Sequence, residues 1–198
     1  MKKTIYLFVD GSNLYGGQYD LFGPGRYLSF PKFIDEAEDH LKIKFDRIFF
    51  YASFSPGGKM PDKKSKYYLK NEALFYKDVK KVEKLVFFKG YRSKTSGKEK
   101  EVDAKLAVDI VDFAHLDKYD ELFLFSGDAD FMHALKIAQD RKKKISILAL
   151  ENRVPNRFAF FYTTHVFVFD NKPKGFFSEK QKIKRIILDK NGVVKEIK

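Results

Sequence analysis

The chain contains no cysteine among its 198 residues. Disulfide bonds, thiolate metal sites and a cysteine nucleophile are therefore excluded. The absence favours an intracellular setting only weakly, because a protein without cysteine can occupy any compartment. Internal repeats and low-complexity runs are also missing from the sequence, so it contains no sign of a repeat protein or a disordered chain.

The sequence does not begin with a hydrophobic run long enough for a signal peptide or a membrane span. Residues 1–4 lead into a short apolar stretch, which Asp10 interrupts. Both kinds of segment need a longer uninterrupted apolar run. We therefore expect a cytoplasmic protein without a membrane partner.

Acidic residues are scarce relative to basic ones: 27 Asp and Glu stand against 39 Lys and Arg, a formal net charge of +12. Such an excess favours a polyanionic partner, with nucleic acid first and an anionic membrane surface second. A lysine-rich proteome or heat adaptation produces the same excess. Charge alone leaves these explanations open.

Strand and helix patterns alternate along the chain, which has the length of one α/β domain. This alternation predicts βαβ units and a three-layer α/β/α sandwich with a mainly parallel central sheet. Strands are predicted at residues 5–9, 47–52, 85–88, 122–125, 144–150 and 166–169, and helices from about Pro31 and over residues 63–83, 102–114, 131–137 and 155–162.

Two segments fall outside this alternation. Residues 14–27 are rich in glycine and aromatic residues and predict a loop,. Residues 172–198 predict a basic C-terminal extension, separate from a domain over residues 1–171. Apolar stretches at 183–188 and 193–197 flank a turn signal at 189–192, so we expect a small hairpin there; a helix over 180–188 is the alternative.

Three aspartates follow predicted strands. The first strand ends at Asp10, and the strand 122–125 leads through Ser126-Gly127 to Asp128 and Asp130. If the two strands are parallel neighbours, these carboxylates converge at the carboxyl edge of the sheet, where open α/β folds bind ligands.

A fourth aspartate, Asp103, starts a predicted helix. The positive end of the helix dipole favours a carboxylate there, and that end can face the edge of the sheet. Each aspartate also has an ordinary explanation as a turn residue, a helix cap or a first-turn acid. It is their joint occurrence that favours a common site.

Several carboxylates close together repel one another unless a cation neutralises them or some of them are protonated. Hard divalent ions such as Mg²⁺ or Mn²⁺ prefer surroundings made only of oxygen. Such an ion polarises a phosphodiester and lowers the pKa of a bound water. The histidines give no zinc pattern, because they lie on separate predicted elements: His40, His115, His133 and His165.

Three spaced motifs carry this chemistry: Val-Asp-Gly-Ser-Asn at 9–13, Lys-Glu-Val-Asp at 100–103 with Leu-Ala-Val-Asp at 106–109, and Ser-Gly-Asp-Ala-Asp-Phe at 126–131. Together they resemble the NYN domain of the PIN-like nuclease superfamily, and most of all its bacterial and archaeal LabA-like branch. The resemblance covers about residues 4–170 and implies a PIN-like fold and a Mg²⁺- or Mn²⁺-dependent ribonuclease.

The resemblance also implies roles for single residues. By position, the acidic metal site comprises Asp10, Asp103, Asp128 and Asp130. Asn13 orients the site or the substrate, and Ser126 supports it together with Ser12. Asp109 lies off the helix face of Asp103, so a solvated or supporting role is expected. Glu101 departs from the family, where glycine is common, and residues 16–27 are longer and more aromatic than its pattern; both leave substrate choice open.

Candidate RNA contacts come from two residue types. Aromatic residues of the predicted loop could stack on unpaired bases or pack over the sheet edge instead: Tyr15, Tyr19, Phe22 and Tyr27. Lysines could contact phosphates or simply form a solvated face: Lys63, Lys64, Lys66, Lys94, Lys98 and Lys100. Tyr15, Lys98 and Lys100 represent these groups as predicted RNA-binding residues.

The sequence thus predicts a metal-dependent endoribonuclease acting on single-stranded or structured RNA, with a homodimer as an option. A non-catalytic RNA-binding or scaffold protein of the same fold is one alternative, and a structure-specific DNA nuclease is another. A haloacid-dehalogenase-like phosphatase is disfavoured, because Ser12 stands where that chemistry needs a second acid.

Overall fold

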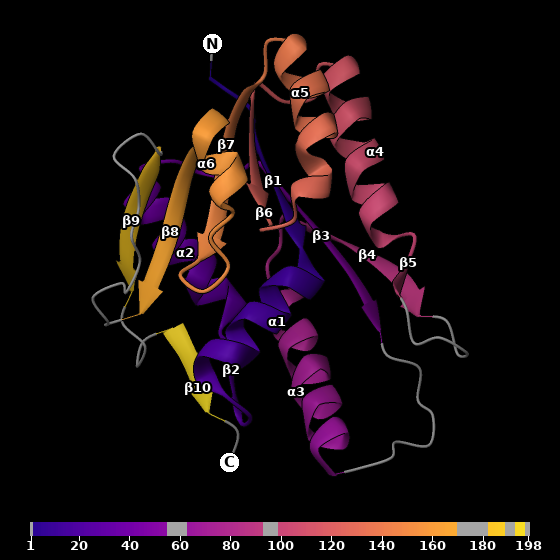
Figure 1. Cartoon of the computed structure of the whole chain (residues 1–198), viewed down its shortest axis with the longest axis vertical. Helices are drawn as coiled ribbons and strands as arrows, with labels where there is room; N and C mark the ends of the chain where they lie inside the picture. Colours follow the sequence, from indigo (N-terminus) through magenta and orange to yellow (C-terminus); the bar gives the residue numbers. More distant parts are fainter. Residues whose placement is uncertain (1, 55–62, 93–98, 170–181, 189–192, 197–198) are drawn as a thin grey trace.

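The computed structural model describes residues 2–54, 63–92, 99–169, 182–188 and 193–196. In this part of the chain the main sheet has eight strands in the order β5-β4-β3-β1-β6-β7-β8-β9 (Figure 1). All neighbouring pairs are parallel except β4 with β5. The predicted mainly parallel sheet is therefore confirmed.

The strands of the main sheet are β1 (Ile5–Asp10), β3 (Arg47–Phe54), β4 (Leu85–Arg92), β5 (Glu99–Lys100), β6 (Glu121–Phe125), β7 (Lys144–Leu150), β8 (Thr163–Phe169) and β9 (Ile183–Leu188). A second sheet pairs β2 (Arg26–Leu28) with β10 (Val194–Glu196) in antiparallel register.

Helices cover both faces of the main sheet (Figure 1). One face carries α1 (Gly11–Phe22), α2 (Phe30–Leu41) and α3 (Lys63–Val79). The other carries α4 (Val102–His115), α5 (Met132–Asp140) and α6 (Asn156–Phe161), with the short 3₁₀ helix η1 (Ala129–Phe131) leading into α5. These are the three predicted layers.

Each face of the sheet has its own hydrophobic core, as the alternation of β1 shows. Leu7 and Val9 pack in the core beneath α1, α2 and α3, whereas Phe8 packs in the core beneath α4, α5 and α6. Successive side chains of a strand point to opposite faces. Because β1 is buried on both faces, its apolar run can only be interrupted at its end, where Asp10 lies.

The predicted loop at residues 14–27 is wrong over most of its length, because residues 11–22 form α1. Asp10 caps this helix, accepting a hydrogen bond from the Asn13 backbone N–H at 3.0 Å,. Gly17 serves close packing: an added Cβ would lie 2.9 Å from Arg153 Cγ and 3.1 Å from Leu150 Cδ1. Contacts with a distant strand thus favour a helix where local composition favours a loop.

The predicted C-terminal hairpin is also wrong. Its first strand, β9, pairs in parallel with β8 and forms an edge of the main sheet. Its second strand, β10, pairs with β2 instead. The two strands never pair with each other, because each finds a partner strand from earlier in the chain; the turn signal at 189–192 lies outside the described residues.

Candidate active site

Asp10 and the segment that begins with Ser126 meet at the carboxyl edge of the sheet. Strands β1 and β6 are parallel neighbours, with Val9 opposite Phe125. Asp10 is the last residue of β1, and Ser126 follows the last residue of β6. The parallel arrangement therefore delivers both chain segments to the same place, although they are 116 residues apart.

Ser126 links the two segments through its hydroxyl. Its Oγ donates to Asp10 Oδ2 at 2.9 Å and accepts from the Asp128 backbone N–H at 3.0 Å. Ser126 is fully buried, and Asp10 is only 5% exposed. A buried carboxylate needs such hydrogen bonds to offset its lost hydration. Ser126 thus fixes the carboxylate of Asp10 relative to the backbone of Asp128.

Asn13 makes a second link between the same segments. The Gly127 backbone N–H donates to Asn13 Oδ1 at 3.2 Å. A Cβ on Gly127 would lie 2.8 Å from the carbonyl oxygen of Arg153, which is tighter than side chains allow. Only glycine lets the turn after β6 sit against this backbone.

Both strand-end aspartates also act as caps, so that ordinary explanation is correct for each. Asp10 caps α1, and Asp128 caps η1 by accepting from the Asp130 backbone N–H at 2.9 Å. Capping does not exhaust a carboxylate, which has about four acceptor sites. In the part of the chain that the structure describes, Asp128 Oδ2 has no hydrogen-bond partner, and both Asp128 and Asp130 are exposed.

Asp103 and Asp109 occupy different places on α4. Asp103 is exposed in the first turn. Asp109 is buried: the Tyr51 hydroxyl donates to its Oδ2 at 2.7 Å, and Lys105 pairs with its Oδ1. Burial and the Asp109 carboxylate raise the pKa of Tyr51, so its hydroxyl stays protonated. Tyr51 lies opposite Asp10 on the neighbouring strand β3. Through its hydrogen bond to Tyr51, Asp109 therefore helps to hold the strand beside Asp10 in place.

The side chains at this edge offer oxygen atoms that could hold a metal ion. Among the described residues, no group of three or more Asp, Glu or His side chains is arranged to hold a metal ion. Mg²⁺, however, is usually held by one or two carboxylates together with water and substrate phosphates. Asp10 and Asp128 supply two carboxylates, and the Asn13 and Ser126 side chains hold the two segments that carry them together. This donor set fits Mg²⁺ or Mn²⁺.

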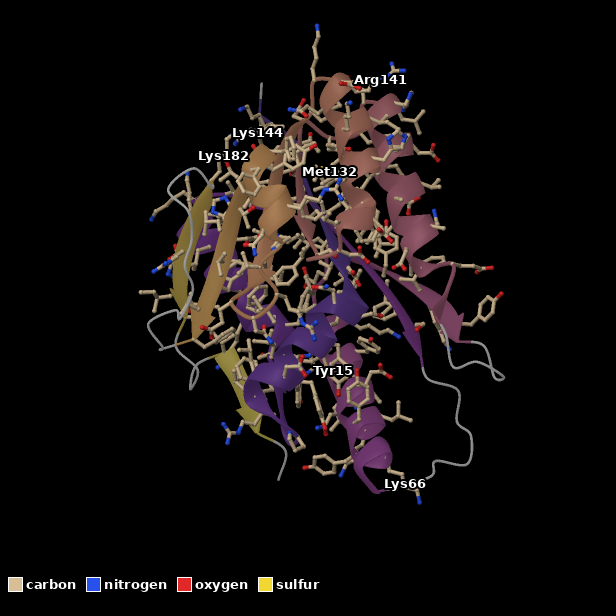
Figure 2. The ribbon with its side chains drawn as sticks, viewed as in Figure 1. Tyr15, Lys66, Met132, Arg141, Lys144 and Lys182 are labelled. Atoms are coloured by element: carbon tan, nitrogen blue, oxygen red, sulfur yellow. The ribbon has the colours of Figure 1, made fainter. Side chains whose placement is uncertain are left out.

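Tyr15 does not fit its predicted role in stacking on RNA bases. Tyr15, which Figure 2 labels, is 1% exposed, and its hydroxyl donates to the Tyr68 carbonyl on α3 at 2.8 Å. The other three aromatic candidates pack in or against the same core: Tyr19, Phe22 and Tyr27. Packing over the sheet edge, the alternative, is therefore correct for these side chains.

Three further predictions are placed only in part. Lys98 lies outside the described residues, and Lys100 is described only through its backbone in β5. Ser12 is half-buried in the first turn of α1.

The histidines lie on four separate elements, as expected. None of the described helices is long and apolar enough to cross a membrane.

Sequence reasoning missed Arg153. It follows β7, whose carboxyl end reaches the same edge of the sheet as those of β1 and β6. The carbonyl of Arg153 approaches Gly127, and its guanidinium pairs with Asp20 of α1. The rule that led to Asp10 and Asp128 could also have found this residue, because it follows a predicted parallel strand.

Comparisons with known proteins agree with this architecture. The sequence model of the NYN domain family matches residues 4–166 of the chain. A crystal structure of a protein of unknown function from Vibrio parahaemolyticus superimposes with a TM-score of 0.61 at 16% identity, over 97% of this chain and 96% of that one; at this identity the likeness concerns the fold alone. A comparison with curated proteins found no match.

Proposed function

The chain belongs to the NYN domain family of PIN-like nucleases, and we propose that it is a metal-dependent endoribonuclease of the LabA-like branch that hydrolyses RNA phosphodiester bonds. The observation that carries this proposal is the Ser126 bridge between Asp10 and Asp128. A buried, hydrogen-bonded carboxylate beside an exposed one is a suitable place for a divalent cation to meet a phosphate.

Asp10 and Asp128 would hold the cation, and Asp103 and Asp130 are proposed as further ligands or as acceptors for its water molecules. When bound, a divalent ion supplies Lewis-acid polarisation of the phosphodiester and a more acidic water. The chain's own part is positioning: Ser126 and the Asn13 backbone each donate to one oxygen of Asp10. The carboxylate is then already oriented before substrate arrives, which lowers the cost of reaching the reactive geometry.

The direct test is a cleavage assay on single-stranded RNA, duplex RNA and DNA, with Mg²⁺ or Mn²⁺ and with EDTA. We expect Asp10→Asn and Asp128→Asn to lower RNA cleavage by about a hundredfold or more, because each removes charge that holds the cation. RNA binding should be retained or tightened, since a negative charge is lost. Asparagine keeps the capping oxygen, so the fold should persist.

Asp112→Asn is the matched control, because Asp112 is exposed on α4 in the described structure and caps no helix through its side chain. It should cleave RNA at the wild-type rate. Wild-type cleavage by Asp10→Asn in saturating Mn²⁺ would refute the proposed site. Cleavage of DNA in preference to RNA would show that the protein is a DNA nuclease and would refute the proposed RNA substrate.

A non-catalytic RNA-binding protein is the second candidate. The observation that favours it is the lack, among the described residues, of a preformed group of three or more metal ligands. Isothermal titration calorimetry with Mn²⁺ distinguishes the two proposed functions. If the protein is a nuclease, it should bind Mn²⁺, and Asp10→Asn should weaken this binding. If it is a non-catalytic scaffold, Asp10→Asn should not change Mn²⁺ binding.

A further inference from the structure

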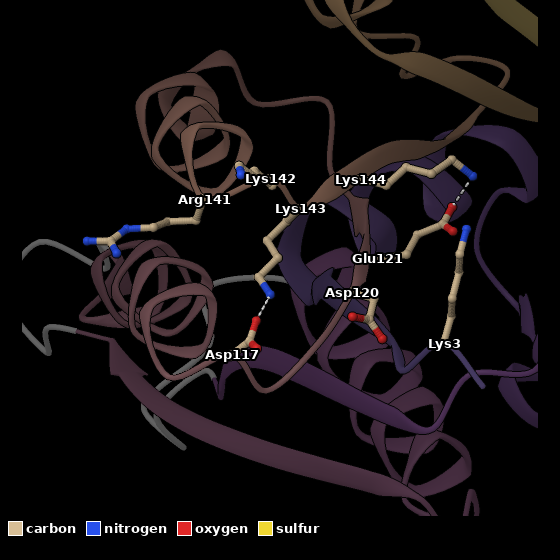
Figure 3. A pocket seen from close by; sticks show the side chains of 8 residues that line it. All are labelled: Lys3, Asp117, Asp120, Glu121, Arg141, Lys142, Lys143 and Lys144. Carbon is tan, nitrogen blue, oxygen red and sulfur yellow. Dashed lines mark hydrogen bonds and ion pairs between the residues drawn. The ribbon is translucent and has the colours of Figure 1, made fainter. Parts of the chain in front are cut away.

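The opposite edge of the sheet, where the strands begin, carries a pocket of about 420 Å³ lined by five basic and three acidic side chains. They come from the segment before β1, the turn between α4 and β6, and the turn between α5 and β7: Lys3, Asp117, Asp120, Glu121, Arg141, Lys142, Lys143 and Lys144 (Figure 3). We call this the amino-edge pocket. It contains none of the proposed catalytic residues.

The acidic residues of the amino-edge pocket are already occupied. Lys143 pairs with Asp117, Lys144 Nζ lies 2.7 Å from Glu121 Oε1, and Asp120 accepts from the Thr4 backbone N–H at 2.7 Å. In Figure 3 the Lys143 and Lys144 amines point at these carboxylates. With five basic and three acidic side chains, the pocket keeps a formal net charge of +2.

Three cations of the amino-edge pocket have no ion-pair partner among the described residues: Arg141, Lys142 and Lys3. Arg141 and Lys142 are exposed. With Lys42, Lys3 also lines a neighbouring hollow, where Lys2 pairs with Asp46 and Lys44 with Glu38. Basic side chains thus extend along this edge, whereas Asp128 and Asp130 are exposed at the carboxyl edge.

Helix α5 joins the two edges. Asp130 precedes it and Arg141 follows it, as Figure 2 shows for Met132 and Arg141 at its two ends. At a rise of 1.5 Å per residue, the eleven steps from Asp130 to Arg141 span about 17 Å. His133 and Lys136 are exposed between them at helical spacing,. At about 3.4 Å per stacked nucleotide, this distance corresponds to about five nucleotides.

We infer that the amino-edge pocket binds the phosphate backbone of the RNA substrate, at a point about five nucleotides from the bond being cleaved. This inference rests on the proposed RNA substrate. RNA leaving the carboxyl edge follows α5 and places a phosphate against Arg141 and Lys142. The pocket supplies affinity that the acidic carboxyl edge cannot supply before a cation is bound, because exposed carboxylates repel a polyanion.

The test is RNA binding by the full chain in EDTA, measured by fluorescence anisotropy with single-stranded oligonucleotides of about three and about twelve nucleotides. The variant is Arg141→Gln/Lys142→Asn. Asparagine suits position 142, where the backbone has a φ of 63°,. The matched control, Lys32→Gln/Lys77→Gln, removes the same charge from α2 and α3, on the other face of the sheet.

We expect the pocket variant to bind the longer RNA about three- to tenfold more weakly than the control does, with a salt slope smaller by about 1.4. In EDTA the carboxyl edge repels RNA, so the short RNA should also bind at the pocket and should also bind the pocket variant more weakly than the control. No loss beyond that of the control, for either length, would overturn the inference. Loss of inorganic phosphate binding without loss of RNA binding would assign the pocket to free phosphate and overturn it as well.

Because no cation is present, this measurement does not depend on cleavage. If the wild-type chain does not cleave RNA but the pocket variant binds RNA more weakly than the control, the nuclease is refuted and the pocket is kept. If the wild-type chain cleaves RNA but the pocket variant binds RNA as well as the control does, the pocket is refuted and the nuclease is kept.

Discussion

Replacing Ser126 with alanine should destabilise the protein and slow the proposed reaction together. The Ser126 hydroxyl is the donor to Asp10 Oδ2 and the acceptor from the Asp128 N–H. Alanine fills nearly the same space, so the change removes hydrogen bonds without creating a large cavity. Asp10, only 5% exposed, keeps the Asn13 N–H on Oδ1 but loses the Ser126 donor on Oδ2.

The magnitude follows from the charge and burial of Asp10. A hydrogen bond to a charged group contributes about 1.5–3 kcal/mol, and leaving a buried partner unsatisfied costs a similar amount. Water can replace the bond to the Asp128 N–H, because Asp128 is exposed. We therefore expect a loss of about 2–3 kcal/mol in the free energy of unfolding, equivalent to a fall in Tm of about 5–10 °C for a chain of this size.

The assay combines urea unfolding with RNA cleavage measured well below the Tm of the variant. Ser146→Ala is the control: Ser146 is a buried serine on the neighbouring strand β7, and its side chain makes no hydrogen bond within the described structure. Cleavage by Ser126→Ala should fall by up to about a hundredfold, because a small displacement of a positioned carboxylate is costly. Equal unfolding free energies for the two variants would refute this reasoning.

Two other predictions test the packing and the electrostatics. Gly16→Ala should stabilise the protein by about 0.5–1 kcal/mol through helix propensity, because among the described residues its Cβ would meet only Arg153 Nη2, at 3.6 Å. Gly17→Ala should destabilise it, because that Cβ would have contacts at 2.9 and 3.1 Å. Thermal unfolding should rank the two variants in this order, and the reverse order would disprove the packing argument. Burial, with Lys184 and Lys144 nearby, lowers the pKa of His165 from 6.5 to about 4. Between pH 6.5 and pH 4, His165 is therefore protonated in the unfolded chain but neutral in the folded chain. The free energy of unfolding should fall as the pH is lowered through this range, by about 2 kcal/mol at about pH 5. His165→Gln should remove this dependence, and equal slopes for the two proteins in urea unfolding between those pH values would contradict it.

The strands and the edge of the sheet could be predicted because they depend on local patterns. Apolar runs that end at Asp10 and at Ser126 mark buried parallel strands, and parallel strands carry their carboxyl ends to one edge,. The link between Asp10 and Asp128 could be anticipated from that rule alone. Its actual form, a shared Ser126 hydroxyl and an Asn13 amide, depends on side-chain geometry that no pattern contains.

The errors arise where a distant contact overrides a local signal. Gly16 and Gly17 indicate a turn when read locally, but the structure uses Gly17 to bring α1 against β7. Once this segment is a helix, Tyr15 belongs to its buried face, which is why its predicted exposure failed with the predicted loop. The hairpin failed in the same way, because β9 and β10 each pair with a strand far away in sequence.

Those two pairings have a consequence for any shortened form of the protein. Ile186 and Leu188 of β9 pack in the core, and the Val193 carbonyl accepts from the Ser29 N–H at 2.7 Å. A chain cut at residue 171 would lose the side chains by which β9 covers this core and the bond that holds Val193 beside β2,. A stable fragment therefore has to extend past the family domain as far as β9 and β10.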